Sequence, residues 1–133
     1  MRDHRKLRAF ELADKVALMI YQITKQFPKE ELYGLTSQMR RAAVSVPSNI
    51  VEGCARESQT EYRRFMEIAF GSLRELHYQF DLSKRLGYIN QTESENYEKT
   101  LTETEKVLNA LVRSVRNNRE TLSLSLQTIN LQP

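Results

Sequence analysis

Apolar residues recur every three or four positions along most of the chain. Over residues 7–26 this period places six of them on one face of a predicted helix: Leu7, Phe10, Ala13, Ala17, Ile20 and Tyr21. The Phe27-Pro28 step predicts the end of that helix, because the residue before a proline avoids the α-helical region. We expect a short turn to follow, which Gly34 closes.

The same period predicts three further helices. The second begins near Thr36, a good N-cap residue, and the third begins with the capping box Ser58–Glu61. Gly87 is expected to end the third helix, and a second capping box, Thr92–Glu95, to begin the fourth. The residues expected in the core of these helices are Met39, Ala42, Ala43, Val46, Ile50, Tyr62, Phe65, Met66, Ala69, Leu73, Leu76, Phe80, Tyr97, Leu101, Leu108, Leu111, Val112 and Val115.

Four long amphipathic helices with short connections predict an all-α fold, an antiparallel up-down four-helix bundle over residues 9–118. A basic N-terminal arm over residues 1–8 precedes the bundle. A tail over residues 119–133 follows it. Its last 13 residues are uncharged, and Leu alternates with Ser there at the period of a strand. This tail is either flexible or an added edge that pairs with a neighbour.

The second helix contains two unusual residues. Pro47 removes one helical hydrogen bond and crowds the carbonyl of Ala43, so we expect a local irregularity that does not break the helix. Gly53 lowers helix propensity, which is reasonable if another backbone comes close.

Helices two and three each carry a second apolar face. A helix in a monomeric bundle needs one apolar stripe, so the additional residues predict a homo-oligomer. The residues assigned to this interface are Val44, Val51, Ala55, Ile68, Phe70, Tyr78 and Leu82. The alternative is that they are scattered surface residues, which are common.

The net charge of +3 resides entirely in the arm, where Arg2, Arg5, Lys6 and Arg8 stand against Asp3. A flexible basic arm can contact phosphates, or it is simply a solvated terminus. The other candidates for nucleic-acid contacts are Arg40, Arg41, Arg56, Arg63, Arg74 and Arg85. The last three recur every eleven residues, but Glu67 and Asp81 fall on the same side, so a salt-bridged surface is the alternative.

No motif points to catalysis. One cysteine and two histidines cannot form a zinc site, and His77 follows Glu75 by two positions, which fails the spacing of di-iron bundles. We therefore expect no catalytic residue, no metal, no cofactor and no enzymatic activity. Cys54 is expected to pack as a small apolar side chain. No apolar run is long enough for a membrane span, and a cytoplasmic protein is expected.

The run FPKEELYGLTSQMRRAAVSVPSNIVEG (27–53) closely resembles the signature of the ribosomal RNA intervening-sequence protein family. RRFMEIAFGSLREL (63–76) and LGYI (86–89) extend the resemblance over about residues 7–115. It implies a left-handed up-down bundle assembled as a homopentamer around a central axis. The family name marks the position of bacterial genes within ribosomal RNA genes and establishes no activity. This chain has no tryptophan in its first helix and has Val51 where many members have alanine.

Two functions follow from these observations. The first is a non-enzymatic oligomer that associates with RNA through basic surface residues. The second is a homo-oligomeric scaffold that binds another protein through its ring surface or its C-terminal tail.

Overall fold

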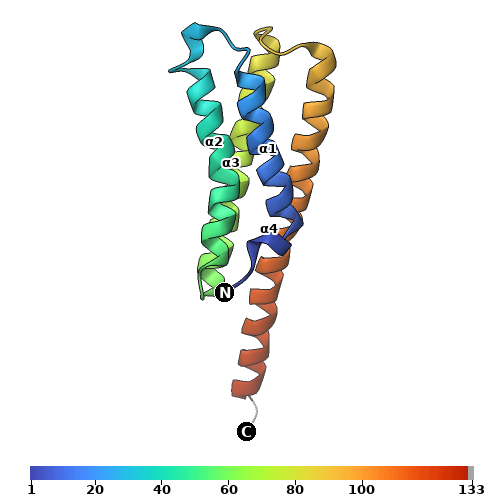
Figure 1. The fold of residues 1–133 in the computed structure, drawn as a ribbon. Helices are drawn as coiled ribbons and strands as arrows, with labels where there is room; N and C mark the ends of the chain where they lie inside the picture. The colour runs from blue at the N-terminus through green and yellow to red at the C-terminus, as the bar shows by residue number, and fades with distance from the viewer. Residues whose placement is uncertain (132–133) are drawn as a thin grey trace.

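The computed structural model describes the backbone of residues 1–131 and the side chains of residues 1–117. This part of the chain is all-helical and contains α1 (Arg8–Thr24), α2 (Leu35–Cys54), α3 (Gln59–Arg85) and α4 (Gln91–Leu131), with short 3-10 turns η1 (His4–Lys6) and η2 (Lys29–Glu31). The four helices lie side by side (Figure 1), and each packs against two others, in the pairs α1–α2, α2–α3, α3–α4 and α1–α4. The prediction of four helices in a bundle is confirmed.

The core is formed by the residues that the helical period selects. The large apolar side chains that are fully buried are Ile20, Met39, Val46, Ile50, Met66, Leu73, Leu76, Phe80, Leu101 and Leu108, together with Val16, which was not among the predicted residues. Burying each such side chain stabilises the fold by roughly 1.5–3 kcal/mol relative to leaving it in water. Tyr21, which shares the apolar period of α1, is exposed. No helix within the described residues is long and apolar enough to span a membrane.

Tyr88 joins two connections at one end of the bundle. Its hydroxyl donates to Glu31 Oε2 at 3.0 Å, and its ring lies 5.3 Å from the ring of Phe27. The Glu31 carboxylate raises the pKa of Tyr88, because it accepts a hydrogen bond from the neutral phenol. The segment after α1 is thereby held against the segment after α3.

Two of the helix ends match the ends predicted from the sequence, and two differ from them. Ser58 Oγ accepts from the Glu61 amide at 3.1 Å, and Gly87 follows α3 with a φ of +80°, as predicted. The Thr92 cap is wrong, because Asn90 Oδ1 accepts from the Thr92 amide at 2.8 Å and α4 begins one residue earlier. The Thr36 cap is also wrong, because α2 begins at Leu35 and Thr36 is buried.

Helix α2 continues through Pro47, so the expectation that this proline does not break it is confirmed. Asn49 Nδ2 donates to the Ser45 carbonyl at 2.7 Å on the same stretch. Gly53 lies where α2 and α3 come close together. A Cβ atom at this position would lie 2.8 Å from Phe65 Cβ and 2.6 Å from Met66 Cε, so side-chain atoms exclude a larger residue, and the nearest backbone atom, Tyr62 O, would lie 3.5 Å away.

The period-two alternation of the C-terminal segment does not form a strand. The backbone of α4 is helical up to Leu131 and extends past the ends of the other three helices in Figure 1. Leu122, Leu126 and Ile129 follow Val115 at steps of seven, four and three, so the same residues also satisfy the helical period. Most of the predicted tail over 119–133 therefore belongs to α4, and residues 132–133 lie outside the described part.

Candidate nucleic-acid interface

The arginine row of α3 (Arg63, Arg74 and Arg85) is paired with carboxylates along its whole length. Arg63 Nε lies 2.8 Å from Glu67 Oε1, and Arg85 Nε lies 3.0 Å from Asp81 Oδ2. Arg74 pairs with Glu105 across the α3–α4 contact. The pKa of Glu67 is lowered, chiefly by its hydrogen bond from Arg63. Of the two interpretations of this row, the structure favours the salt-bridged surface.

The N-terminal arm contacts the bundle, so the expectation of a flexible arm is wrong. The Arg2 amide donates to the Cys54 carbonyl at 3.1 Å, and Arg2 Nη1 donates to the Arg56 carbonyl at 2.8 Å. The Arg2 guanidinium also lies 3.9 Å from the centre of the Tyr62 ring. These contacts satisfy carbonyl groups at the end of α2. The sequence alone does not predict them, because these carbonyl groups lie more than fifty residues from Arg2 along the chain.

Three other predicted cations are also engaged by acids. Arg5 pairs with Asp3 at 3.0 Å, Arg8 with Glu103 at 2.6 Å, and Arg56 with Glu52 at 2.9 Å. Of the arm's basic residues, Lys6 stays exposed without an ion pair within residues 1–117. Surface pairs of this kind contribute little stability, but they reduce the positive potential that a phosphate would meet.

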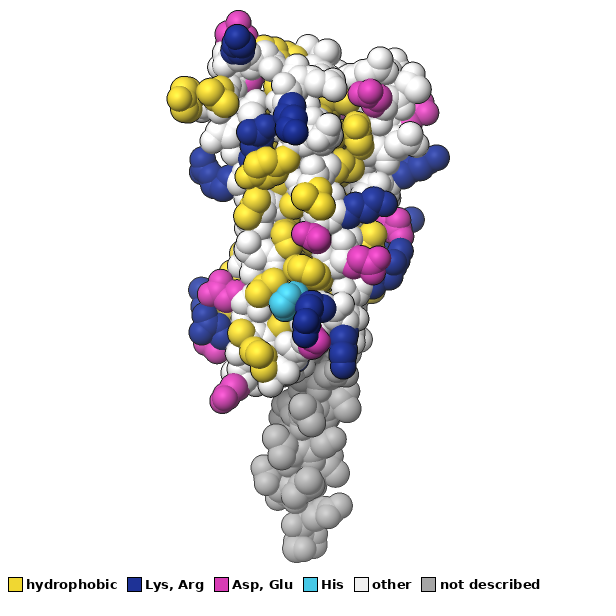
Figure 2. All heavy atoms as spheres, viewed as in Figure 1, with side chains coloured by type: hydrophobic (Ala, Val, Ile, Leu, Met, Phe, Trp, Pro, Cys, Tyr) yellow, Lys and Arg dark blue, Asp and Glu magenta, His cyan; other side chains and the backbone are white. Residues whose placement is uncertain are grey.

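Arg40 and Arg41 lie in a groove between α1, the η2 segment and α2, which we call the α1–α2 groove. Its lining residues are Tyr21, Leu32, Tyr33, Thr36, Ser37, Arg40, Arg41 and Val44. None of them is acidic. Arg40 Nε donates to Thr24 Oγ1 at 2.8 Å, while Arg41 is exposed. Figure 2 shows basic and hydrophobic side chains next to one another on the face over α1 and α2.

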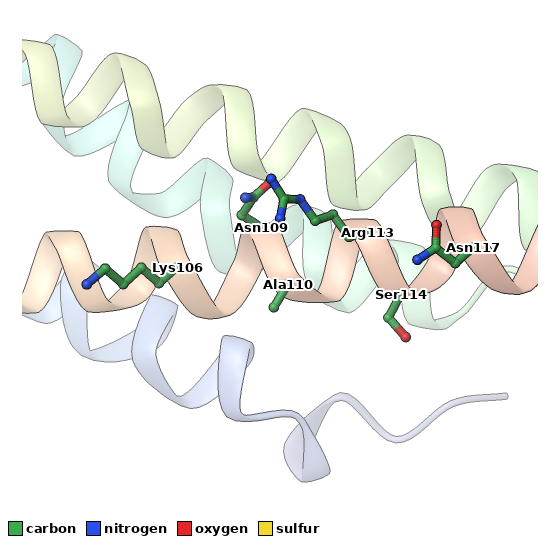
Figure 3. Close-up of a pocket in the computed structure, with 6 residues that line it drawn as sticks. All are labelled: Lys106, Asn109, Ala110, Arg113, Ser114 and Asn117. Carbon is green, nitrogen blue, oxygen red and sulfur yellow. The ribbon is translucent and has the colours of Figure 1, made fainter.

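A second basic surface lies on α4 and was not selected from the sequence. A shallow depression there, which we call the α4 basic face, is lined by Lys106, Asn109, Ala110, Arg113, Ser114 and Asn117. In Figure 3, Asn109 and Arg113 point toward one another, and Ala110 and Ser114 lie along the opposite edge of the helix. No ion pair within residues 1–117 involves Lys106 or Arg113. A signal for this face was present, since residues 106–117 include no Asp or Glu.

His77 lies at the α3–α4 contact with a carboxylate at each ring nitrogen. Its Nε2 lies 2.7 Å from Glu98 Oε1, and its Nδ1 contacts Glu105. Burial alone would lower the pKa of His77, but the hydrogen bonds with the two carboxylates outweigh it, and the pKa is raised. The carboxylates do not converge on one point, and no group of three His, Cys, Asp or Glu side chains in the described residues could hold a metal ion.

Cys54 is buried at the end of α2. Burial raises the pKa of its thiol, which disfavours the reactive thiolate. The interpretation of this residue as a packed apolar side chain agrees with that environment.

Most of the residues predicted to form the second apolar face are exposed. Val44, Val51, Ala55, Ile68 and Tyr78 are exposed, whereas Phe70 and Leu82 are half-buried and pack against the core. The face spans α2 and α3, which are joined by a Ser45–Ser72 hydroxyl hydrogen bond of 2.8 Å. We use the name α2–α3 face for the five exposed residues.

Over residues 1–131, these features define an all-helical, four-helix protein with an exposed apolar face and two basic surfaces. Residues 5–110 match the 23S rRNA-intervening sequence protein family, and the chain belongs to that family. A crystal structure of a protein with unknown function from the S23 ribosomal protein family of Bacteroides thetaiotaomicron VPI-5482 is similar to this chain, with a TM-score of 0.72 and 21% identity. The similarity covers 79% of this chain and 95% of that one, and it shows the fold alone. No curated protein matches the chain.

Proposed function

We propose that the chain is a non-enzymatic, cytoplasmic homo-oligomer that binds RNA through phosphate contacts. The observation that carries the RNA-binding part is the α4 basic face, where Lys106 and Arg113 are accompanied by uncharged residues alone. Cations that neutralise phosphates release condensed counterions, and this release supplies sequence-independent affinity. An arginine already paired with a carboxylate must first break that pair, so the α3 row contributes less.

Oligomer formation is supported by the α2–α3 face and by Gly71. A Cβ atom added at Gly71 would meet no atom within 4 Å, so nothing within one chain requires a glycine there. A glycine inside a helix costs about 1 kcal/mol relative to alanine. The close approach of another copy of the chain would explain it, and the family resemblance suggests five copies around an axis.

Short connections support an antiparallel up-down order of the helices within each copy, and the family resemblance implies a left-handed one. Residues 55–58 join α2 to α3, and residues 86–90 join α3 to α4. Helices joined by so few residues are usually antiparallel neighbours in a bundle. Repetition of one α4 basic face per copy would then combine weak phosphate contacts into a stronger one through avidity.

A salt titration of binding to a structured RNA tests the RNA-binding part. The variant Lys106→Gln/Arg113→Gln removes the α4 cations, and Arg63→Gln/Arg85→Gln is the matched control that removes two acid-paired cations. The α4 variant should reduce the slope of log affinity against log salt by about 1.5 units, from roughly 0.7–0.9 per lost contact. The control should change the slope by much less. Binding that ignores salt, or an α4 variant that binds like the wild type, would contradict the proposal.

Light scattering at micromolar concentration tests the oligomer, and Gly71→Ala sharpens the test. In a monomer this change stabilises α3 by about 1 kcal/mol. In the proposed oligomer the added methyl group lies at the subunit contact and lowers the association constant. A monomer mass across dilutions, together with a more stable variant, would rule out assembly through this face.

The α2–α3 face also favours a second candidate function, the scaffold that binds another protein. That candidate predicts a defined oligomer whose retention on RNA is independent of salt. The same titration therefore separates the two functions.

A further inference from the structure

The α1–α2 groove carries two exposed aromatic rings that the bundle does not use. Tyr33 is 94% exposed at the end of the connection between α1 and α2, and Tyr21 is 44% exposed on α1. An aromatic side chain usually buries most of its ring and stabilises the fold by doing so. Tyr33 contributes almost nothing of this kind within the chain, so its ring is available to a ligand.

The groove also holds one guanidinium in a fixed position. Arg40 Nε donates to Thr24 Oγ1, and that hydroxyl in turn donates to the Ile20 carbonyl at 2.7 Å. The Arg40 guanidinium carbon lies 4.8 Å from the centre of the Tyr21 ring. A planar guanidinium held at Nε keeps its terminal nitrogens for a further acceptor, and phosphate oxygens match that geometry.

The remaining lining residues set the charge of the groove. Arg41 adds a second, exposed cation, and Ser37 and the tyrosines add hydroxyl groups. Because no lining residue is acidic, the groove is complementary to an anion. A flat ring, two guanidinium groups and several hydroxyls together match a nucleotide, which offers a base to stack on and a phosphate to neutralise.

The geometry points to the α1–α2 groove as a binding site for unpaired nucleotides of single-stranded RNA, with a base stacked on Tyr33 and the adjacent phosphate at Arg41. This inference rests on the proposed function and adds to it a preference for single-stranded over double-stranded RNA. The α4 basic face contacts the backbone of any RNA, whereas the groove needs a base whose face is free. Bases in a duplex are already stacked on their neighbours, so the groove discriminates single strands from duplexes.

Binding of a single-stranded oligoadenylate and of its duplex with oligouridylate, compared for variants of Tyr33, tests the inference. Base–aromatic stacking is worth about 1–3 kcal/mol per base, so Tyr33→Leu should weaken binding of the single strand by about fivefold to 150-fold. Duplex binding should stay unchanged. Tyr33→Phe is the matched control, and because it keeps the ring it should bind the single strand like the wild type.

A second readout follows the ring directly. The chain has no tryptophan, so Tyr33→Trp places a single indole in the groove. Its emission should be quenched by the single-stranded oligoadenylate and not by inorganic phosphate or by the duplex. Quenching by all three probes, or by none of them, would overturn stacking at this position.

The outcomes separate this inference from the proposed function. If Lys106→Gln/Arg113→Gln weakens binding of both RNAs while Tyr33→Leu weakens neither, RNA binding stands and the groove is not the site. If Tyr33→Leu instead changes the mass of the assembly, the groove is a contact with another copy of the chain and the inference is wrong. If the wild type retains neither RNA, the proposed function fails and this inference fails with it.

Discussion

Helices α3 and α4 both present basic side chains at regular intervals, yet their surroundings are opposite. On α3, Arg63 and Arg85 each have a carboxylate four residues away, at Glu67 and Asp81. On α4, Lys106 and Arg113 are seven residues apart and share a depression with uncharged residues. The arginine row of α3 therefore has more cations than the α4 basic face, but less of its positive charge is available to a phosphate.

The difference shows that the spacing of basic residues is a weak guide to a phosphate-binding surface. The position of acids one helical turn away, or on the neighbouring helix, decides how much of the charge is available. Glu105 illustrates the second case, because it belongs to α4 and pairs with Arg74 on α3. A basic surface is better recognised by the absence of acids, as in residues 106–117.

The largest effect is expected from adding an acid to the α4 basic face. In Ala110→Glu, the new carboxylate lies four residues after Lys106 and three before Arg113, within reach of both on a helix. It should reduce the salt slope of RNA binding by about 1.5 units without removing a cation, because both contacts are compromised. A salt titration against Ala110→Gln, which has similar size and no charge, isolates the charge effect. Equal slopes for the two variants would show that α4 does not contact phosphates.

The reverse change, which removes an acid from the arginine row of α3, should improve RNA binding by α3. Glu67 accepts from Arg63 at 2.8 Å and from Arg116 at 3.5 Å, so Glu67→Gln releases both. The variant should bind RNA more tightly at low salt and increase the slope by about one unit, chiefly through Arg63, since the contact of Arg116 with Glu67 is the longer of the two. Glu61→Gln, which removes an acid from the same helix without an ion pair, is the control. A slope that rises equally in both variants would mean that net charge matters and pairing does not.

Arg2 extends the comparison to a cation that supports the fold. Arg2→Ala removes hydrogen bonds to the Arg56 carbonyl and to Gln59, as well as the contact with Tyr62. It should lower the free energy of unfolding by about 1 kcal/mol, because the contacts are partly solvated, and leave the salt slope unchanged. Urea unfolding measures the first effect. Lys6→Ala, which removes the same charge nearby, should leave stability almost unchanged.

The smallest effect concerns the pH dependence of the α3–α4 contact. The pKa of His77 is raised in the fold by Glu98 and Glu105, from an unfolded value of about 6.5. A raised pKa means that protonation stabilises the fold below the unfolded pKa, and that this stabilisation is lost as the pH rises through the folded pKa. The melting temperature should therefore fall as the pH rises above about 6.5. His77→Gln should remove most of this fall, and an unchanged pH profile in that variant would contradict it.

The helices were predictable because burial imposes the period that apolar residues show. The cap at Ser58 and the end at Gly87 were predictable because both depend on neighbours within a few residues. The contacts of Arg2 were not predictable, since its partners lie far along the chain at residues 54–62. The exposure of Tyr33 was not predictable either, because it depends on the η2 turn leaving that ring outside the bundle. The Leu–Ser alternation near the C-terminus fits two periods at once, so it could not distinguish a strand from the end of α4.

The close approach at Gly53 restricts how this sequence can drift over generations. The atom that an added side chain would meet at 2.8 Å is Phe65 Cβ, which every residue except glycine possesses. Replacing Phe65 by a smaller residue therefore does not make room at position 53, although the flexible end of Met66 could move aside. A descendant that keeps α2 and α3 at this separation must keep Gly53, whereas one that loses it must move the two helices apart.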